Sequence, residues 1–145
     1  MTTKIDRFQG ETRWLSNFEY ALIVYEGISY PTNEHAFQAT KTLDFDKRRE
    51  IAKLSTPRDA KRAGRLLELR PDWEEVKLGI MFDINSRKFW FHEHLKEKLL
   101  LTGDAELIEG NSWGDTFWGV CNGIGRNELG KILMKIRSRM RALEE

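Results

Sequence analysis

The sequence is poor in cysteine and proline and contains no long apolar run. Its single cysteine, Cys121, excludes an internal disulfide and is typical of a protein kept in a reducing compartment. No segment approaches the roughly 18 apolar residues of a membrane span, and no apolar stretch follows Met1 to predict a signal peptide. We therefore expect a soluble, cytoplasmic protein with no membrane partner.

An excess of charge of either sign is also missing. The 24 Lys and Arg residues nearly balance the 23 Asp and Glu residues, so net charge does not argue for a polyanionic partner. The length of 145 residues suits one domain with a real core. No repeat or linker divides the chain, and we expect a single domain over residues 1–145.

Hydrophobic spacing predicts a mainly α fold, or α+β with a minor N-terminal β-hairpin. Short strands are expected at residues 4–9 and 21–25, and a turn at Glu26-Gly27 would lead into residues 28–30. Helices are expected at about residues 34–41, 46–54 and 57–67, and again from residue 128. Over residues 73–100 the apolar spacing fits either one long helix or a broken pair.

The helix expected at about residues 34–41 carries acidic, amide, aromatic and amine side chains on one face. Pro31 disfavours helix before it, and Thr32 or Asn33 can cap a start at about Glu34. The predicted core face carries Ala36, Ala39 and Leu43, and the opposite face carries Glu34, Phe37, Gln38 and Lys41. On spacing alone this second face is a solvated one, but the large Phe37 favours a cleft.

Two glycine-containing segments near the C-terminus are candidates for ligand binding. The loop from Gly123 to Asn127 precedes the last helix, where free backbone N–H groups can hold phosphate; a plain helix-entry turn is the alternative. In the Asn111–Gly119 run, Trp118 beside Gly119 suits stacking on a base, and core packing is an equal alternative.

Several motifs follow one another along the chain: Leu15-Ser16-Asn17-Phe18, Tyr30-Pro31-Thr32-x-Glu34-His35-x-Phe37-Gln38-x-x-Lys41, Ala63-Gly64-Arg65, Arg70-x-Asp72-Trp73, Asp115-x-x-Trp118-Gly119 and Gly125-x-Asn127. In this order they resemble the YbiA-like proteins, also called the NADAR family, from about residue 8 to 137. Val120-Cys121-Asn122 departs from the family pattern, in which Asp or Gly is frequent, and this is expected to bear on substrate choice.

The resemblance implies a mainly helical YbiA-like domain that cleaves an N-glycosidic bond to C1 of a phosphorylated ribose. One activity of the family removes ADP-ribose from modified guanine, opposing a toxin-like ADP-ribosyltransferase that is a possible genetic partner. The other hydrolyses N-ribosyl phosphate intermediates of riboflavin synthesis. The expected substrate is thus an ADP-ribosylated nucleic acid or a ribose-phosphate metabolite.

Such chemistry needs an acid for the leaving base and an anion or nucleophile at C1. We predict Glu34 and Lys41 as the chemical pair, with Lys41 able to form a Schiff base and Asp115 orienting the ribose. The residues predicted to bind substrate are Asn17, Phe18, Phe37, Gln38, Arg65, Trp118, Gly119, Gly125, Arg126 and Asn127. Of these, Trp118 would stack on the base, and Arg65 and the segment Gly125 to Asn127 would receive phosphate.

No residue pattern calls for a metal or redox cofactor, and we expect a metal-free reaction. His92 and His94 have no further ligand nearby in the sequence and are predicted to lie on the surface. A non-catalytic module that binds ADP-ribose or nucleotides is the first alternative. A nucleic-acid-binding domain that uses the basic last helix is the second, and the balanced net charge weakens it.

Overall fold

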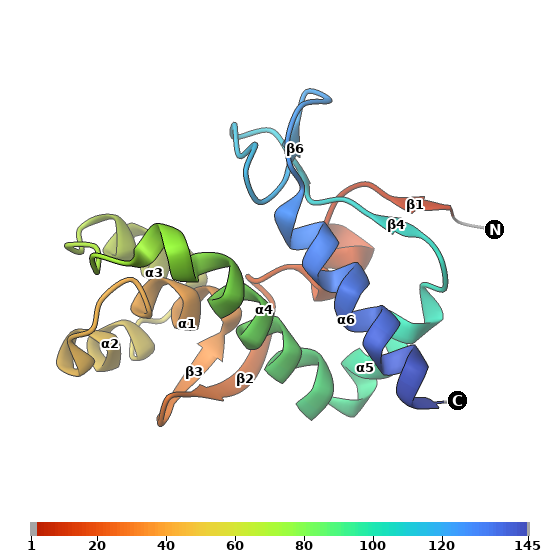
Figure 1. Cartoon of the computed structure of the whole chain (residues 1–145). Coiled ribbons are helices and arrows are strands. Elements are labelled where there is room, and N and C mark those ends of the chain that lie inside the picture. The colour runs from red at the N-terminus through yellow and green to blue at the C-terminus, as the bar shows by residue number, and fades with distance from the viewer. Residues whose placement is uncertain (1–2, 145) are drawn as a thin grey trace. The chain divides into compact units, whose positions relative to one another are not determined.

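The computed structural model describes residues 3–144, and helices make up most of this part of the chain (Figure 1). The helices are α1 (Asn33–Ala39), α2 (Phe45–Ala52), α3 (Pro57–Arg65), α4 (Trp73–Phe91), α5 (Glu93–Leu101) and α6 (Glu128–Glu144), with the 3₁₀ helix η1 (Gly10–Leu15). The strands are β1 (Lys4–Ile5), β2 (Tyr20–Tyr25), β3 (Ile28–Thr32), β4 (Glu106–Leu107), β5 (Gly110–Asn111) and β6 (Val120–Cys121). The mainly helical fold predicted from the sequence is confirmed.

The chain forms two compact units. The central unit comprises Asn17–Lys88, and the terminal unit combines the residues up to Ser16 with those from Phe89 onward. The prediction of a single domain stays a prediction. Within residues 3–144, no helix has the length and apolar character needed to cross a bilayer.

The central unit contains the predicted hairpin. Strands β2 and β3 pair antiparallel, with Tyr25 opposite Ile28, and buried and exposed residues alternate along β2. Glu26 and Gly27 form the turn with φ angles of 48° and 83°. Two positive φ angles suit the right-handed twist of a two-residue hairpin, so this local prediction is confirmed.

Helix α1 is enclosed rather than half solvated. All seven of its residues are buried, whereas Leu43, predicted for the core, is 57% exposed. The alternative of a solvated face, which spacing alone favoured, is excluded because α2, α3 and the hairpin pack around this short helix (Figure 1). The prediction that Leu43 lies in the core was wrong. The helix does begin as predicted, since the Thr32 hydroxyl accepts a hydrogen bond from the backbone N–H of His35 at 3.1 Å.

In the terminal unit, β1 lies parallel to β4, with Ile5 opposite Leu107, and α6 packs against β4. Helices α4 and α5 are the broken pair that the sequence allowed, and they are separated at His92.

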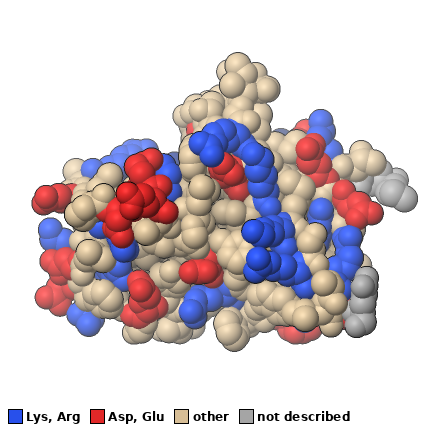
Figure 2. Space-filling model, viewed as in Figure 1, with Lys and Arg blue, Asp and Glu red and all other residues tan. Residues whose placement is uncertain are grey.

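Lys and Arg side chains gather over α6 on the face drawn in Figure 2. One basic residue of α6 is buried, however: Arg137 donates to Thr102 Oγ1 at 2.9 Å and to the Ala105 carbonyl at 2.8 Å.

Lys88 near the end of α4 is fully buried in the central unit. Burial lowers the pKa of its ammonium group from 10.5 to about 7, and the charge of Glu19 opposes this shift. At a pH between these two pKa values, Lys88 is protonated in the unfolded chain and neutral in the folded chain. The contribution of Lys88 therefore makes the folded state more stable as pH rises through this window.

We expect the stability difference between wild type and Lys88→Met to depend on pH. From about pH 7 to about pH 10 the wild type should gain about 1 kcal/mol or more in free energy of unfolding relative to the variant. Urea denaturation at several pH values measures this, with the exposed Lys47→Met as the matched control. Parallel stability curves for wild type and Lys88→Met would contradict the assignment.

Candidate active site

The central unit brings the α1 residues of the predicted site together. Gln38 Nε2 donates to Glu34 Oε2 at 2.6 Å, and the two residues are only 5% and 8% exposed. The ring of Phe37 packs on the ring of Trp73 with 5.1 Å between centroids. A carboxylate is thus held beside an amide and two aromatic rings, with little access to bulk water.

Asn17 makes hydrogen bonds to the first two residues of α1, Asn33 and Glu34. Its backbone carbonyl accepts from the Glu34 N–H at 3.0 Å, and its side-chain oxygen accepts from Asn33 at 3.1 Å and from Asn85 at 3.3 Å. Its amide nitrogen lies 3.4 Å from the sulfur of Met81. These contacts of Asn17 hold the backbone of Glu34 in place, and its predicted contact with substrate stays a prediction.

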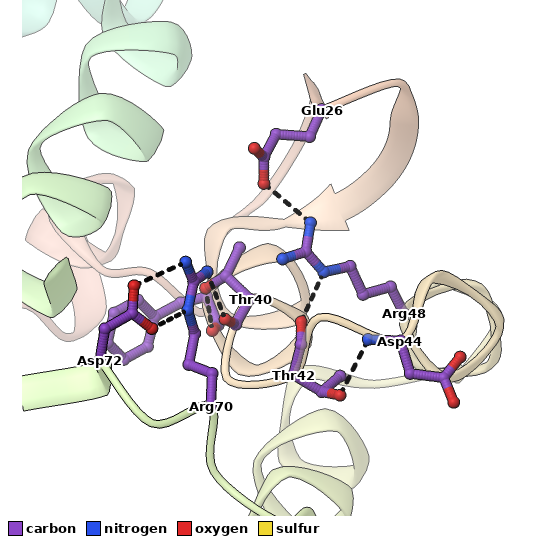
Figure 3. Close-up of polar contacts among 8 residues, drawn as sticks. Glu26, Thr40, Thr42, Asp44, Arg48, Arg70 and Asp72 are labelled. Atoms are coloured by element: carbon purple, nitrogen blue, oxygen red, sulfur yellow. Dashed lines mark hydrogen bonds and ion pairs between the residues drawn. The ribbon is translucent and has the colours of Figure 1, made fainter.

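The backbone around Lys41 is held by two arginines. The carbonyls of three consecutive residues each accept a hydrogen bond: Thr40 from Arg70 Nη1 at 3.4 Å, Lys41 from the Arg70 N–H at 2.8 Å, and Thr42 from Arg48 Nε at 2.8 Å. Figure 3 shows both guanidinium groups converging on this segment. The base of the Lys41 side chain is therefore anchored, although the residue lies just beyond the end of α1.

Each of these arginines is in turn oriented by a carboxylate (Figure 3). Arg70 donates from Nε and Nη2 to the two oxygens of Asp72 at 2.7 and 3.2 Å, and this hydrogen bonding lowers the pKa of Asp72. Arg48, only 1% exposed, donates to Glu26 Oε1 at 2.8 Å. The two-point contact with Asp72 fixes the plane of the Arg70 guanidinium. Because Arg70 also donates to the carbonyls of Thr40 and Lys41, Asp72 helps to hold the backbone at Lys41.

The environment of Lys41 favours its neutral amine. Its side chain is half-buried, and burial is the largest cause that lowers its pKa below 10.5. The charges of Arg65, Lys61 and Lys77 lower it further, while the charge of Glu34 raises it. A lysine with a lowered pKa carries more of the unprotonated form that can attack carbon.

The remaining predicted site residues belong to the terminal unit. Asp115 Oδ1 accepts from the N–H groups of Phe117 and Trp118 at 3.1 and 2.9 Å, which closes a turn. Its own N–H and carbonyl bond to the side chain of Asn111. The ring of Trp118 is half-buried and meets the Phe117 ring edge-on at 4.8 Å.

The glycines of this region are required by close backbone packing. A Cβ atom on Gly119 would collide with the carbonyl and carboxylate of Glu109, and one on Gly125 would collide with the carbonyl of Gly119. Gly125 also has a φ of 155°. In the described part of the chain, Gly119 is thus approached by protein backbone, which was one of the two possibilities that the sequence suggested.

Three of the five N–H groups in the Gly123–Asn127 loop, those of Ile124, Arg126 and Asn127, are occupied by backbone carbonyls. Backbone N–H groups there donate to backbone carbonyls: Ile124 to Cys121, Arg126 to Thr116, Asn127 to Gly119, Glu128 to Phe117 and Leu129 to Trp118. The Asn127 side chain bonds to the Glu109 N–H and the Leu107 carbonyl at 2.9 Å each. Arg126 pairs with Glu128 and lies over the Phe117 ring. The loop thus has the contacts of a helix-entry turn, and phosphate binding by Gly125, Arg126 and Asn127 stays a prediction.

Among residues 3–144 no group of three or more His, Cys, Asp or Glu side chains is arranged to hold a metal ion.

Several residues that shape the site were not predicted from the sequence, namely Arg48, Lys61, Arg70, Lys77 and Asn85. The basic cluster at Lys61 and Arg65 was visible in the sequence, but its spacing is equally that of a solvated face. Phe18 was predicted to bind substrate and is half-buried.

Comparison with known proteins matches the model of the NADAR domain to residues 6–141. The chain is 41% identical over 128 residues to "N-glycosidase YbiA" of Escherichia coli strain K12, which covers 86% of this chain and 79% of that protein. It is 39% identical over 133 residues to a riboflavin biosynthesis protein of Vibrio vulnificus, covering 88% of this chain and 35% of that one. The solution structure of E. coli YbiA superposes with a TM-score of 0.88 at 37% identity, over 99% of this chain and 89% of that one.

Proposed function

The chain belongs to the NADAR family and is a hydrolase acting on N-glycosyl bonds, and we propose that it cleaves the bond between C1 of a phosphorylated ribose and a base. The preferred substrate is ADP-ribosylated guanine. An N-ribosyl phosphate intermediate of riboflavin synthesis is the second candidate, supported by the similarity to the riboflavin biosynthesis protein of Vibrio vulnificus. The observation that carries the proposal is the half-buried Lys41, anchored beside Glu34 and Gln38.

The proposed reaction begins when the Glu34 carboxylate takes a proton from the Lys41 ammonium group, and the neutral Lys41 amine then attacks C1. A bond forms between Nζ and C1 while the bond from C1 to the base nitrogen breaks, and the departing nitrogen takes both electrons and a proton from Glu34. The ring C1–O4 bond then breaks as Nζ loses its proton and O4 gains one, which leaves an open-chain imine. Water adds to C1, the C1–Nζ bond breaks, and Lys41 is returned as the free amine with ribose phosphate released.

The surroundings described above support both roles. Burial favours the neutral form of Lys41, and the arginine hydrogen bonds at residues 40–42 limit movement of its backbone. Gln38 holds one oxygen of Glu34 and so fixes the orientation of the carboxylate. In the terminal unit, the roles of Asp115 toward ribose and Trp118 toward the base stay predictions from the family resemblance.

The proposal is tested by incubating the purified protein, with EDTA present, with DNA that carries ADP-ribosylated guanine. A parallel reaction holds the N-ribosyl phosphate pyrimidine of riboflavin synthesis, and mass spectrometry identifies the products. We expect free ADP-ribose and restored guanine from the DNA. Release from the pyrimidine alone would replace the preferred substrate with the metabolite, and no release from either would contradict the proposed function.

A further inference from the structure

Helix α3 presents two basic residues to the Lys41 side of α1. Ala60 and Gly64 are both buried, and a Cβ atom on Gly64 would collide with the side-chain amide of Gln38. The backbone of α3 therefore lies directly against α1 at this point. Lys61 and Arg65 each follow one of these contact residues, so they lie one turn apart on the same flank of the contact.

Helix α4 supplies a third basic residue from another direction. Trp73 contacts Phe37 of α1, and Lys77 lies one turn further along the same side of α4. The Lys77 side chain is only 17% exposed, and its Nζ is 2.7 Å from Glu74 Oε1. The Glu74 side chain is 78% exposed, so solvent weakens this ion pair. The pair is therefore a weak partner for Lys77, whose own side chain is mostly buried.

Three cations from two helices thus converge on Lys41. Each of their charges disfavours the ammonium form of Lys41, while Glu34 is the carboxylate whose charge favours it. Lys61 and Lys77 are half-buried and Arg65 is exposed. Like charges that lie close together repel one another, and a bound dianion would reduce that repulsion. Lysine and arginine side chains are the usual protein groups for binding phosphate.

We propose that Lys61, Arg65 and Lys77 form an anion subsite that binds the phosphate carried by the same ribose that reacts at Lys41. This inference rests on the proposed function and extends it, since it makes phosphate recognition a property of the central unit. It also offers an alternative to the Gly123–Asn127 loop, in which the N–H groups of Ile124, Arg126 and Asn127 already donate to backbone carbonyls. The ligand class is a phosphate ester of a pentose, whichever base is attached.

The test measures binding of ribose 5-phosphate and of ribose by calorimetry, with wild type, Lys61→Gln, Lys77→Gln and the double variant. Lys53→Gln is the matched control because Lys53 is an exposed lysine of the same unit. We expect each single variant to raise the Kd for ribose 5-phosphate about tenfold, and Lys53→Gln to change it less than twofold. Binding of unphosphorylated ribose should be the same in all five proteins.

The outcomes separate the subsite from the proposed function. Unchanged ribose 5-phosphate binding in Lys61→Gln and Lys77→Gln, or an equal loss in Lys53→Gln, would overturn the subsite even if base release is normal. Loss of binding in the two variants would support the subsite even if the wild-type protein released no base from either substrate. If base release occurs, KM should rise in the variants more than kcat falls, which a general loss of structure would not produce.

Discussion

Replacement of Lys41 by methionine is expected to lower the rate of base release by at least about a thousandfold. Methionine keeps the length and apolar stem of the side chain but cannot attack C1. Lys41→Arg should be equally inactive, because arginine keeps a positive charge but is not a nucleophile at neutral pH. Single-turnover assays on the substrate that gives products measure this loss directly.

Lys53→Met, on an exposed lysine of the same unit, is the control for loss of a charge. The pH dependence of the wild type provides a second check. Since burial lowers the pKa of Lys41, the rate on a substrate whose base departs without a proton should rise with pH through a pKa below 10.5 as the neutral amine forms. Turnover of Lys41→Arg within tenfold of wild type would contradict a nucleophilic role.

Replacement of Glu34 by glutamine is expected to reduce kcat by about a hundredfold to ten-thousandfold, the range found for loss of a general acid or base. The change preserves shape and the backbone hydrogen bond to the Asn17 carbonyl, so the fold should survive. It removes the group that supplies a proton to the leaving nitrogen. The effect is measured as kcat with a natural base and again with a better leaving group.

A leaving group that departs without a proton should recover most of the activity of Glu34→Gln, and none of that of Lys41→Met. Glu68→Gln, on an exposed residue that follows α3, is the matched control for removal of a carboxylate. Equal losses with the natural base and the better leaving group would contradict proton donation by Glu34. They would indicate that its charge acts on C1 instead.

Local rules predicted the parts of the fold that neighbouring residues determine. The Thr32 cap and the Glu26-Gly27 turn depend on side chains and φ angles within a few residues, and both are confirmed. The burial of α1 was not predictable in this way, because α2, α3 and the hairpin enclose it from distant parts of the sequence. Leu43, which fits the apolar stripe of α1, is exposed because the chain has left the helix by Thr40.

The candidate site shows the same division. Glu34 and Gln38 were identified because they share α1, where helical spacing places them on one face. Lys41 was identified with them although α1 ends before it, at Ala39. Asn85 was missed because Asn17 and Asn33, which it contacts, lie 68 and 52 residues before it in the chain. Lys61 and Lys77 were missed because periodicity cannot distinguish a basic residue facing solvent from one facing another helix.

The glycine-spaced loop of the terminal unit shows why sequence spacing could not decide between a phosphate site and a helix-entry turn. Gly123-x-Gly125 before a helix is a good phosphate signal only while the loop N–H groups stay unoccupied. Here those of Arg126 and Asn127 donate to Thr116 and Gly119 at 2.8 and 3.2 Å. Such contacts depend on a tight packing of several loop segments, which sequence spacing does not reveal.

Trapping of the covalent intermediate tests the central claim most directly. Wild-type protein, Lys41→Met and Lys53→Met are each mixed with substrate and sodium borohydride, and intact-protein and peptide mass spectrometry locate any adduct. We predict a stable adduct of ribose phosphate or ADP-ribose at Lys41 in wild type and Lys53→Met, because borohydride reduces an imine to an amine. Efficient base release with no adduct in wild type, or an adduct at another lysine, would contradict catalysis through Lys41.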